Sequence, residues 1–222
     1  ADADHALFGL EHQLTAGVRW HQERIQRDQF RSPNPAIQDL DFARTLTGSA
    51  HREDAAIRVR AWSGYVQDSM KLGKLTVTGG VRLEHVLTTT LIRRASSTAV
   101  NISQTQNDTA VLPGLGAVWQ VAPATELFAG VHAGFAPPRP SRDISTDGPA
   151  RVAPERSTNW ELGLRSQPHD GISFSATVFQ TDFRQIVISS ALGRFINGGR
   201  SRQAGLELSG RIESGPLTGS AH

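Results

Sequence analysis

The chain has no cysteine and no long hydrophobic run, and both absences limit what it can be. Without cysteine it can form neither a disulfide framework nor a thiolate metal site. No segment approaches the roughly 20 apolar residues that a membrane-spanning helix needs. A hydrophobic content of 38% nevertheless suits a protein that crosses a membrane as β-strands, because only alternate residues of such a strand face lipid.

The chain also lacks a large excess of either positive or negative charge. The formal net charge is only +2, and the basic residues are dispersed among acidic ones, which argues against a nucleic-acid partner. The eight histidines have no paired spacing typical of a metal site, so we interpret His5, His12 and His21 as turn and lumen residues. We predict no metal and no cofactor.

What the chain does contain is strict alternation, clearest between Asn159 and Arg165. Successive side chains of a strand point to opposite faces. Here one face receives Asn159, Glu161, Gly163 and Arg165, and the other receives Trp160, Leu162 and Leu164. A strand with one polar and one apolar face can belong to a soluble sandwich or to a membrane barrel.

The same alternation recurs along the chain, more weakly in some segments. It predicts about eight strands, each near the roughly 9–11 residues that cross a bilayer when tilted. The segments are 14–23, 57–65, 75–84, 111–121, 127–135, 159–165, 172–178 and 205–213.

The connections between these segments alternate between short and long. Turns at 71–74, 122–124 and 168–171 are short, whereas polar segments at about 25–54, 88–108 and 136–157 are long, with a shorter one near 189–195. Median connections in compact soluble domains are only about 4–6 residues, whereas outer-membrane barrels combine tight periplasmic turns with long external loops. We therefore predict Leu72-Gly73 and His169-Asp170 at one rim, and Asn34 and Pro138 at the other.

Four motifs, in order, resemble those of TonB-dependent outer-membrane receptors. They are Tyr65-Val66-Gln67-Asp68 before Gly80-Val81-Arg82-Leu83-Glu84, the hairpin from Leu112-Pro113-Gly114 to Ala136-Pro137-Pro138, the strand start Pro154-Glu155, and Phe195-Ile196-Asn197-Gly198-Gly199 before Gly205-Leu206-Glu207-Leu208. Within this family, the chain is most similar to siderophore receptors, especially the ferric dicitrate type.

The resemblance implies an all-β fold, an antiparallel up-and-down transmembrane β-barrel of which this chain forms a partial barrel of about eight strands. It implies a receptor and transporter for an iron chelate in the outer membrane of a Gram-negative cell, and no enzyme. We expect residues 1–222 to be a fragment of the C-terminal barrel domain, beginning in mid-barrel, with the plug domain absent. The implied partners are a ferric chelate, outer-membrane lipid, and TonB, which would bind the missing N-terminal region.

The alternation also assigns side chains to faces. We expect seven charged residues to face the lumen and the plug, where opposite charges on neighbouring strands can pair: Arg19, Arg82, Glu84, Glu161, Arg165, Glu207 and Arg211. Trp20, Trp119 and Trp160 fit outward aromatic girdles, whereas the alternation points Trp62 inward.

Five arginines in or near the long loops are candidate ligand contacts: Arg93, Arg94, Arg139, Arg142 and Arg151. Guanidinium groups make planar bidentate contacts with carboxylate oxygens, and many iron chelates are anionic. Two alternatives stay open. An outer-membrane barrel enzyme, such as a protease or lipase, would need a catalytic constellation at its rim, and a secreted β-sandwich binding module would need two packed sheets and shorter loops.

Overall fold

The computed structural model describes residues 2–7, 9–31, 50–94, 102–138, 152–189, 195–214 and 217–221. Within these ranges the regular structure consists of β-strands. None of the described residues belongs to a helix long and apolar enough to cross a membrane.

Eight long strands carry the architecture, and each contains one of the eight predicted segments, which confirms them. They are β2 (Leu10–Arg31), β3 (Ala50–Leu72), β4 (Leu75–Arg94), β5 (Ile102–Ala122), β6 (Thr125–Ala136), β7 (Glu155–His169), β8 (Ile172–Arg184) and β11 (Arg200–Ser214). Four short strands were not predicted: β1 (Asp2–Leu7), β12 (Leu217–Ala221) and the small hairpin of β9 (Val187–Ser189) and β10 (Phe195–Asn197).

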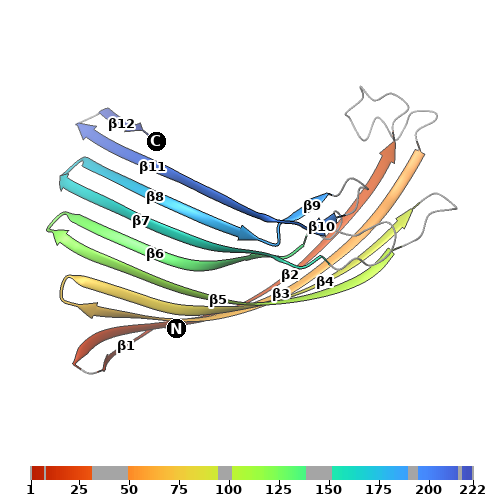
Figure 1. Cartoon of the computed structure of the whole chain (residues 1–222), viewed down its shortest axis with the longest axis horizontal. Helices are drawn as coiled ribbons and strands as arrows, with labels where there is room; N and C mark the ends of the chain where they lie inside the picture. Colours follow the sequence, from red (N-terminus) through yellow and green to blue (C-terminus); the bar gives the residue numbers. More distant parts are fainter. Residues whose placement is uncertain are drawn as a thin grey trace.

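The strands form one curved antiparallel sheet in the order β1-β2-β3-β4-β5-β6-β7-β8-β11-β12 (Figure 1). Almost every strand pairs with its neighbour in the sequence, as in an up-and-down barrel. In the described part of the chain, β1 and β12 are the two edges of an open trough. The sandwich alternative is therefore wrong, because it requires two sheets packed face to face.

The two rims of the sheet differ in the length of their connections, as the alternation of short and long connections in the sequence predicted. Tight turns join β3 to β4 and β7 to β8, with Gly73 and Gly171 at φ values of 62° and 79°. Pro138 follows the opposite end of β6 and therefore lies at the other rim, as predicted. The prediction for Asn34 falls outside the described residues. We call the two rims the turn rim and the loop rim.

Several strands are much longer than the roughly 9–11 residues predicted from the bilayer thickness. β2 has 22 residues, β3 has 23, β4 has 20 and β5 has 21. The segments 25–31, 50–54, 88–94 and 102–108, predicted as loop, are strand. Alternation fades in these segments because neither face meets lipid there, yet the backbone ladder continues to satisfy its hydrogen bonds.

Large apolar side chains are exposed together on one face. Val18 is 86% exposed and Leu206 is 60% exposed. Leu206 lies opposite Val178 of β8, and Trp20, two residues from Val18, lies opposite Trp62 of β3, so the apolar band continues across strands. With a rise of about 3.3 Å per residue and a tilt of roughly 40°, ten residues of strand span about 25 Å, the height of the apolar band of a barrel. We call this the outer face and the opposite, polar one the inner face.

A small core lies on the inner face toward the loop rim, where β3, β4 and β5 extend past the apolar band. Ala55, Ile57, Val86, Ile92 and Ala110 are buried there, and Ala110 is only 1% exposed. Register places them on the same side as the polar wall and opposite to the apolar band.

The assignment of faces in β3 was wrong. Trp62 lies directly opposite the outward Trp20 and next to His85, with its ring stacked 5.5 Å from the His85 ring, so Trp62 belongs to the outer face. Ile57 and Tyr65 consequently face inward. The sequence misleads here because Ile57 is apolar although it is buried on the inner face. Its apolar side chain was read as a lipid-facing one, which shifted the expected alternation of β3 by one residue.

Candidate functional site: the inner face of the sheet

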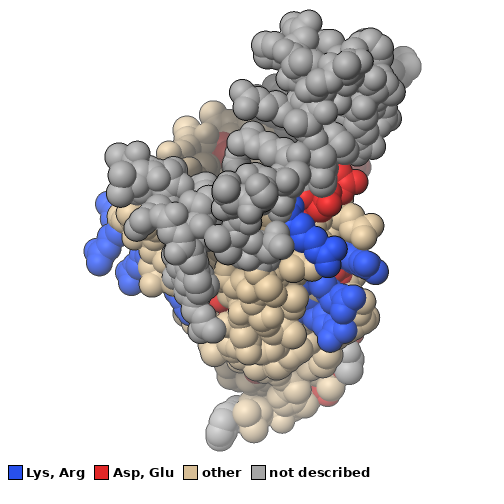
Figure 2. All heavy atoms as spheres, turned by 90° about the vertical axis from the view of Figure 1, so that its right-hand side faces the viewer, with Lys and Arg blue, Asp and Glu red and all other residues tan. Residues whose placement is uncertain are grey.

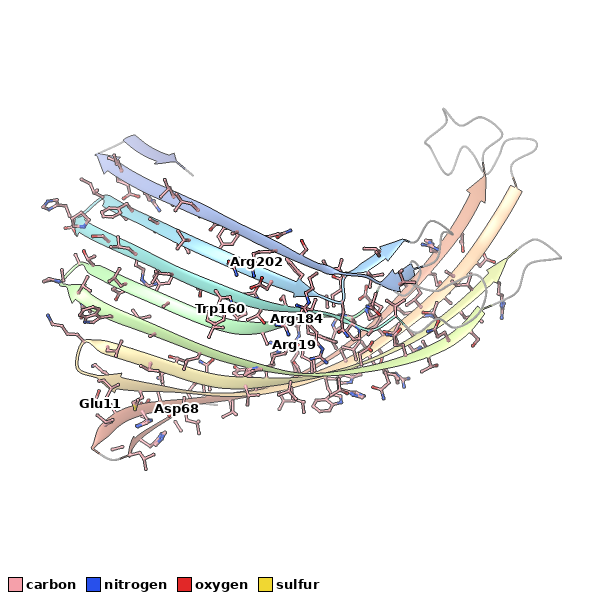
Figure 3. All side chains as sticks on the ribbon, viewed as in Figure 1. Glu11, Arg19, Asp68, Trp160, Arg184 and Arg202 are labelled. Carbon is pink, nitrogen blue, oxygen red and sulfur yellow. The ribbon has the colours of Figure 1, made fainter. Side chains whose placement is uncertain are left out.

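Register fixes which side chains share the inner face. Residues directly opposite each other on neighbouring strands point to the same side of a sheet. The ladder places all seven candidate lumen residues opposite to the apolar band: Arg19, Arg82, Glu84, Glu161, Arg165, Glu207 and Arg211. Figure 3 labels Arg19 at the middle of the trough, where β2 passes behind the other strands.

Ion pairs on this face run both across strands and along them. Arg165 Nε donates to Glu126 Oε2 of β6 at 2.5 Å, which is the expected cross-strand pairing. Arg82 instead donates to Glu84 Oε1 on its own strand at 2.7 Å, and Arg211 pairs with Glu213. These side chains are at least partly exposed, so each pair contributes at most about 1 kcal/mol to stability. Their main effect is to hold the guanidinium groups in place.

Glycines on the inner face lie under aromatic rings. Gly17 pairs with Tyr65, Gly163 with Phe128, and Gly205 with Phe179, each directly across the ladder. A Cβ at Gly205 would lie 2.7 Å from Phe179 Cζ, so the ring occupies the space that a side chain would fill. An aromatic ring over a cross-strand glycine shields the exposed backbone and fixes register.

A hollow of the inner face crosses β3 to β7. It has a volume of about 700 Å³, with a floor of Gly80, Gly114, Gly116 and Gly130. Tyr65, Arg82, His132 and Glu161 stand around this floor. We call it the inner groove. Its size lies within the roughly 300–1,000 Å³ typical of small-molecule sites.

The Arg82 side chain is fixed in the inner groove by two hydrogen bonds. Its Nε contacts Glu84, and its Nη2 donates to Ser63 Oγ at 3.3 Å. Ser63 is buried, whereas Arg82 is exposed to the groove. A guanidinium fixed in this way presents its remaining N–H groups to an anionic ligand.

A second inner hollow of about 480 Å³ lies at the turn rim. It contains the Glu126–Arg165 pair and four serines, Ser166, Ser173, Ser175 and Ser209. Hydroxyl groups both donate and accept hydrogen bonds, so this wall can contact a polar protein surface inside the barrel.

Two motif residues fasten the β9–β10 hairpin to the start of β7 at the loop rim. Asn197 Nδ2 donates to Ala153 O and Gln185 O at 2.8 and 2.9 Å, and Asn197 Oδ1 accepts from Ala153 N at 2.7 Å. Glu155 Oε1 accepts from Val187 N at 2.8 Å. Glu155 of the proline-glutamate motif and Asn197 of the asparagine-glycine motif therefore together hold the hairpin against the start of β7, and we call this pair of residues the latch. Their sequence separation hides this, and no local signal predicted it.

Of the five candidate ligand arginines, the structure describes the side chain of Arg93. Arg93 is exposed on the outer face of β4, away from the inner groove. Arg94 ends β4, but its side chain lies outside the described part, as do Arg139, Arg142 and Arg151.

Near the turn rim, His5, His12 and Asp68 place their ligand atoms within 4.8 Å of one another. His12 Nδ1 lies 2.7 Å from Asp68 Oδ2, and the His5 and His12 rings stack at 5.1 Å. Two imidazoles and a carboxylate are chemically able to ligate a transition metal. His12 and Asp68 lie on the outer face, so the interpretation of His12 as a lumen residue was wrong; the even positions of β2 all face outward.

This geometry defines the wall of an outer-membrane barrel. The family model described as TonB-dependent receptor-like β-barrel matches residues 1–221, so the chain belongs to the TonB-dependent receptor β-barrel family, whose members are outer-membrane proteins of Gram-negative bacteria.

Solved structures share the fold at low identity. The ferric-catecholate import receptor Fiu from E. coli K12, in its closed form, is 16% identical with a TM-score of 0.75, covering 99% of this chain and 36% of its own. The ferric citrate transporter FecA, unliganded, is 19% identical with a TM-score of 0.73, covering 95% and 30%. The siderophore receptor PiuA from Acinetobacter baumannii is 14% identical with a TM-score of 0.73, covering 99% and 37%. This chain thus spans about a third of these receptors.

Proposed function

We propose that this chain is part of the wall of an outer-membrane receptor that takes up a ferric chelate, either a siderophore or ferric citrate, with energy delivered through TonB. The inner groove carries the proposal, because it places a fixed guanidinium on the polar wall of a receptor-type barrel. The plug and the segment that binds TonB belong, in this proposal, to parts of the protein outside residues 1–222. The family and the solved relatives are receptors and transporters, which favours transport over the barrel-enzyme alternative.

The groove suits an anionic ligand in transit. Arg82 supplies charged N–H donors, and His132 and Tyr65 add polar groups around the glycine floor. Absent side chains at Gly114 and Gly116 leave room for a bulky chelate to pass close to the backbone. Glu161, on the other side of the inner groove, repels an anionic ligand. This repulsion keeps the affinity of the groove low enough for the ligand to be released inward.

Capture at the loop rim is assigned to the loop arginines. Arg94, Arg139, Arg142 and Arg151 remain predicted attractors, on the chemical ground that guanidinium suits carboxylate ligands. Arg93 leaves this set because it faces outward.

The test titrates ferric citrate, and separately a neutral hydroxamate chelate, against the intact receptor and three variants. Arg139→Ala with Arg142→Ala removes two loop charges, Arg82→Gln removes the groove guanidinium, and Lys74→Ala removes one charge at the turn rim as the control. We expect the first two variants to bind ferric citrate more weakly and Lys74→Ala to bind it like the wild type. Binding of the neutral chelate should change little.

The salt dependence of binding distinguishes long-range attraction by the loop arginines from direct contact at Arg82. A screened attraction from exposed loop charges should fade as the Debye length falls below about 8 Å, so the loop defect should shrink in high salt. A direct contact at Arg82 should leave a defect that persists. Ferric citrate affinity that is unchanged in both variants at every salt concentration would refute the proposal.

A further inference from the structure

Three polar side chains lie together on the outer face near the turn rim. His5 of β1 pairs directly with His12 of β2, and Asp68 of β3 is the partner of Leu14, the next outward residue of β2. Figure 3 labels Asp68 toward the turn-rim end of the trough. We call His5, His12 and Asp68 the outer histidine cluster. Outward positions of a membrane barrel are mostly apolar, so these three polar residues require an explanation.

The cluster is surrounded by apolar residues. The nearby outward positions on the three strands hold Leu7, Leu10, Leu14, Val66 and Met70. Within this patch the His12 side chain is only 8% exposed, whereas the Asp68 side chain is 38% exposed and His5 is exposed. A buried imidazole in apolar surroundings needs partners for both of its ring nitrogens.

The hydrogen bonding of His12 leaves one of its nitrogens unused. His12 Nδ1 lies 2.7 Å from Asp68 Oδ2. An ionised carboxylate can only accept, so Nδ1 carries the proton and Nε2 keeps its lone pair. This Nε2 is buried without a hydrogen-bond partner among the described residues, and the same is true of Asp68 Oδ1. A metal ion satisfies a buried imidazole lone pair of this kind.

The arrangement of the three residues is typical of metal sites. A histidine that ligates a metal commonly donates its other ring N–H to a carboxylate, which fixes its tautomer and orientation. His5 supplies a second imidazole, because its ring stacks on that of His12 with centroids 5.1 Å apart. One ligand atom from each of the three residues lies within 4.8 Å of the others. Two ligands on opposite sides of a Zn²⁺ ion are roughly 4 Å apart, so a small rotation of the exposed His5 ring suffices.

The charge of the surroundings favours a cation at this rim. Lys71 follows Met70 in the sequence but faces inward, where its Nζ lies 3.6 Å from Glu11 Oε2. Asp68 therefore places negative charge beside the two imidazoles. At the other end of the molecule, the view onto the loop rim shows Lys and Arg side chains on both flanks (Figure 2). Those groups repel a cation.

The height of the cluster makes it accessible from water. His12 lies three residues beyond Gly9 of the turn, which corresponds to roughly 8 Å at a strand tilt of about 40°. Leu14 and Val18, both exposed, follow on the same face. The cluster therefore lies at the turn-rim edge of the apolar band, where the membrane meets water and where an ion can arrive without crossing hydrocarbon.

We propose that the outer histidine cluster binds one divalent transition-metal ion of the Zn²⁺ class. His12 binds it through Nε2 and His5 through a ring nitrogen, and Asp68 holds His12 and adds negative charge beside the ion. Because the three residues come from β1, β2 and β3, the bound ion joins three consecutive strands at the turn rim. This inference does not depend on chelate uptake, since the cluster lies on the outer face and not in the inner groove.

The test titrates Zn²⁺ into the intact receptor by calorimetry, in detergent micelles, with protein that carries no polyhistidine tag and has been freed of metal by a chelator. His12→Gln and His5→Gln each remove a ligand. Asp68→Asn keeps an acceptor for His12 Nδ1 but removes the charge. The matched control is His21→Gln, which removes an inner-face histidine whose Nε2 lies 3.7 Å from Glu23 Oε2.

The expected losses are graded. Removing a residue that only orients a ligand costs about 10–100-fold in metal affinity, and removing a ligand costs at least as much. Asp68→Asn should therefore bind Zn²⁺ about tenfold more weakly at this site, and the two histidine variants about 100-fold more weakly. His21→Gln should bind Zn²⁺ like the wild type. Equal Zn²⁺ affinity in the wild type, His5→Gln and His12→Gln would overturn the proposal.

Two further measurements separate metal binding from a folding defect. Zn²⁺ should raise the midpoint of thermal unfolding of the wild type and leave that of His12→Gln unchanged, because an ion that binds only the native state stabilises it. The first equivalent of Cu²⁺, which nitrogen ligands bind more tightly than Zn²⁺, should give an electron paramagnetic resonance spectrum with two imidazole nitrogens in the wild type and one in His5→Gln. A spectrum that His5→Gln does not change would remove His5 from the site and overturn the proposal.

Discussion

The glycine at position 163 provides the sharpest test of how the inner wall is packed. A Cβ at Gly163 would lie 2.8 Å from Phe128 Cε1 and 2.9 Å from Ala176 O, and it would also strike Phe128 Cζ. The ring can rotate away, but the carbonyl belongs to the ladder of β8 and cannot move without breaking pairing. Gly163→Ala should therefore strain the backbone of two strands.

The magnitude follows from two opposing terms. Replacing glycine by alanine stabilises a protein by about 0.4–1 kcal/mol through the unfolded chain. Overpacking costs about 1–3 kcal/mol. We expect Gly163→Ala to lower the free energy of unfolding by about 1–2 kcal/mol.

Two further glycines serve as graded controls. Gly205→Ala meets only the far end of the Phe179 ring, at 2.7 Å, so it should cost less than Gly163→Ala. A Cβ at Gly210 has no heavy atom within 4 Å, so Gly210→Ala should be neutral or slightly stabilising. Urea unfolding of the intact receptor in phosphatidylcholine vesicles, followed by tryptophan fluorescence, measures all three. If Gly163→Ala were as stable as Gly210→Ala, the close approach of β7 to β8 would be refuted.

Two other perturbations test the faces and the latch. Leu162→Arg places a charge on the apolar band and should cost roughly 2–4 kcal/mol in a vesicle-folding assay, whereas Glu161→Gln on the inner face should leave folding intact; the reverse ranking would refute the assignment of faces. Asn197→Ala removes three hydrogen bonds and should speed amide hydrogen exchange at Val187–Ser189 and Ala153 by about tenfold or more while the β7–β8 ladder stays protected; equal protection throughout would show that the latch carries no stability.

Alternation predicted the fold well where lipid enforces it. Around Trp160 to Leu164 the outer side chains must be apolar and the inner ones need not be, so the sequence states both faces directly. Beyond the bilayer this pressure disappears. The inner-facing Ile57 and the outward Arg58 then read as a shifted pattern, and Trp62 was assigned to the wrong face as a result.

Site residues were harder to predict because they depend on pairing between distant segments. Glu155 accepts from Val187, and Asn197 bonds to Ala153, only when the start of β7 and the β9–β10 hairpin lie side by side. His12 and Asp68 are separated by a long connection, and only the β2–β3 ladder makes them neighbours. A single sequence gives the period of each strand but not the offset between strands, which turns and glycine–aromatic contacts set.

The solved relatives show why the wall alone does not identify the ligand. A TM-score of 0.75 at 16% identity means that the shape survives replacement of most side chains. What such a wall requires is an apolar side chain outside, a polar or small one inside, and glycine where an aromatic ring crosses. Receptors whose names specify catecholate and citrate complexes share this fold. In the proposed function, we therefore expect selectivity to depend on positions free of these requirements, such as the polar residues Arg82, His132 and Glu161 around the inner groove. Exchanging these three residues should change which chelate binds while leaving the barrel intact.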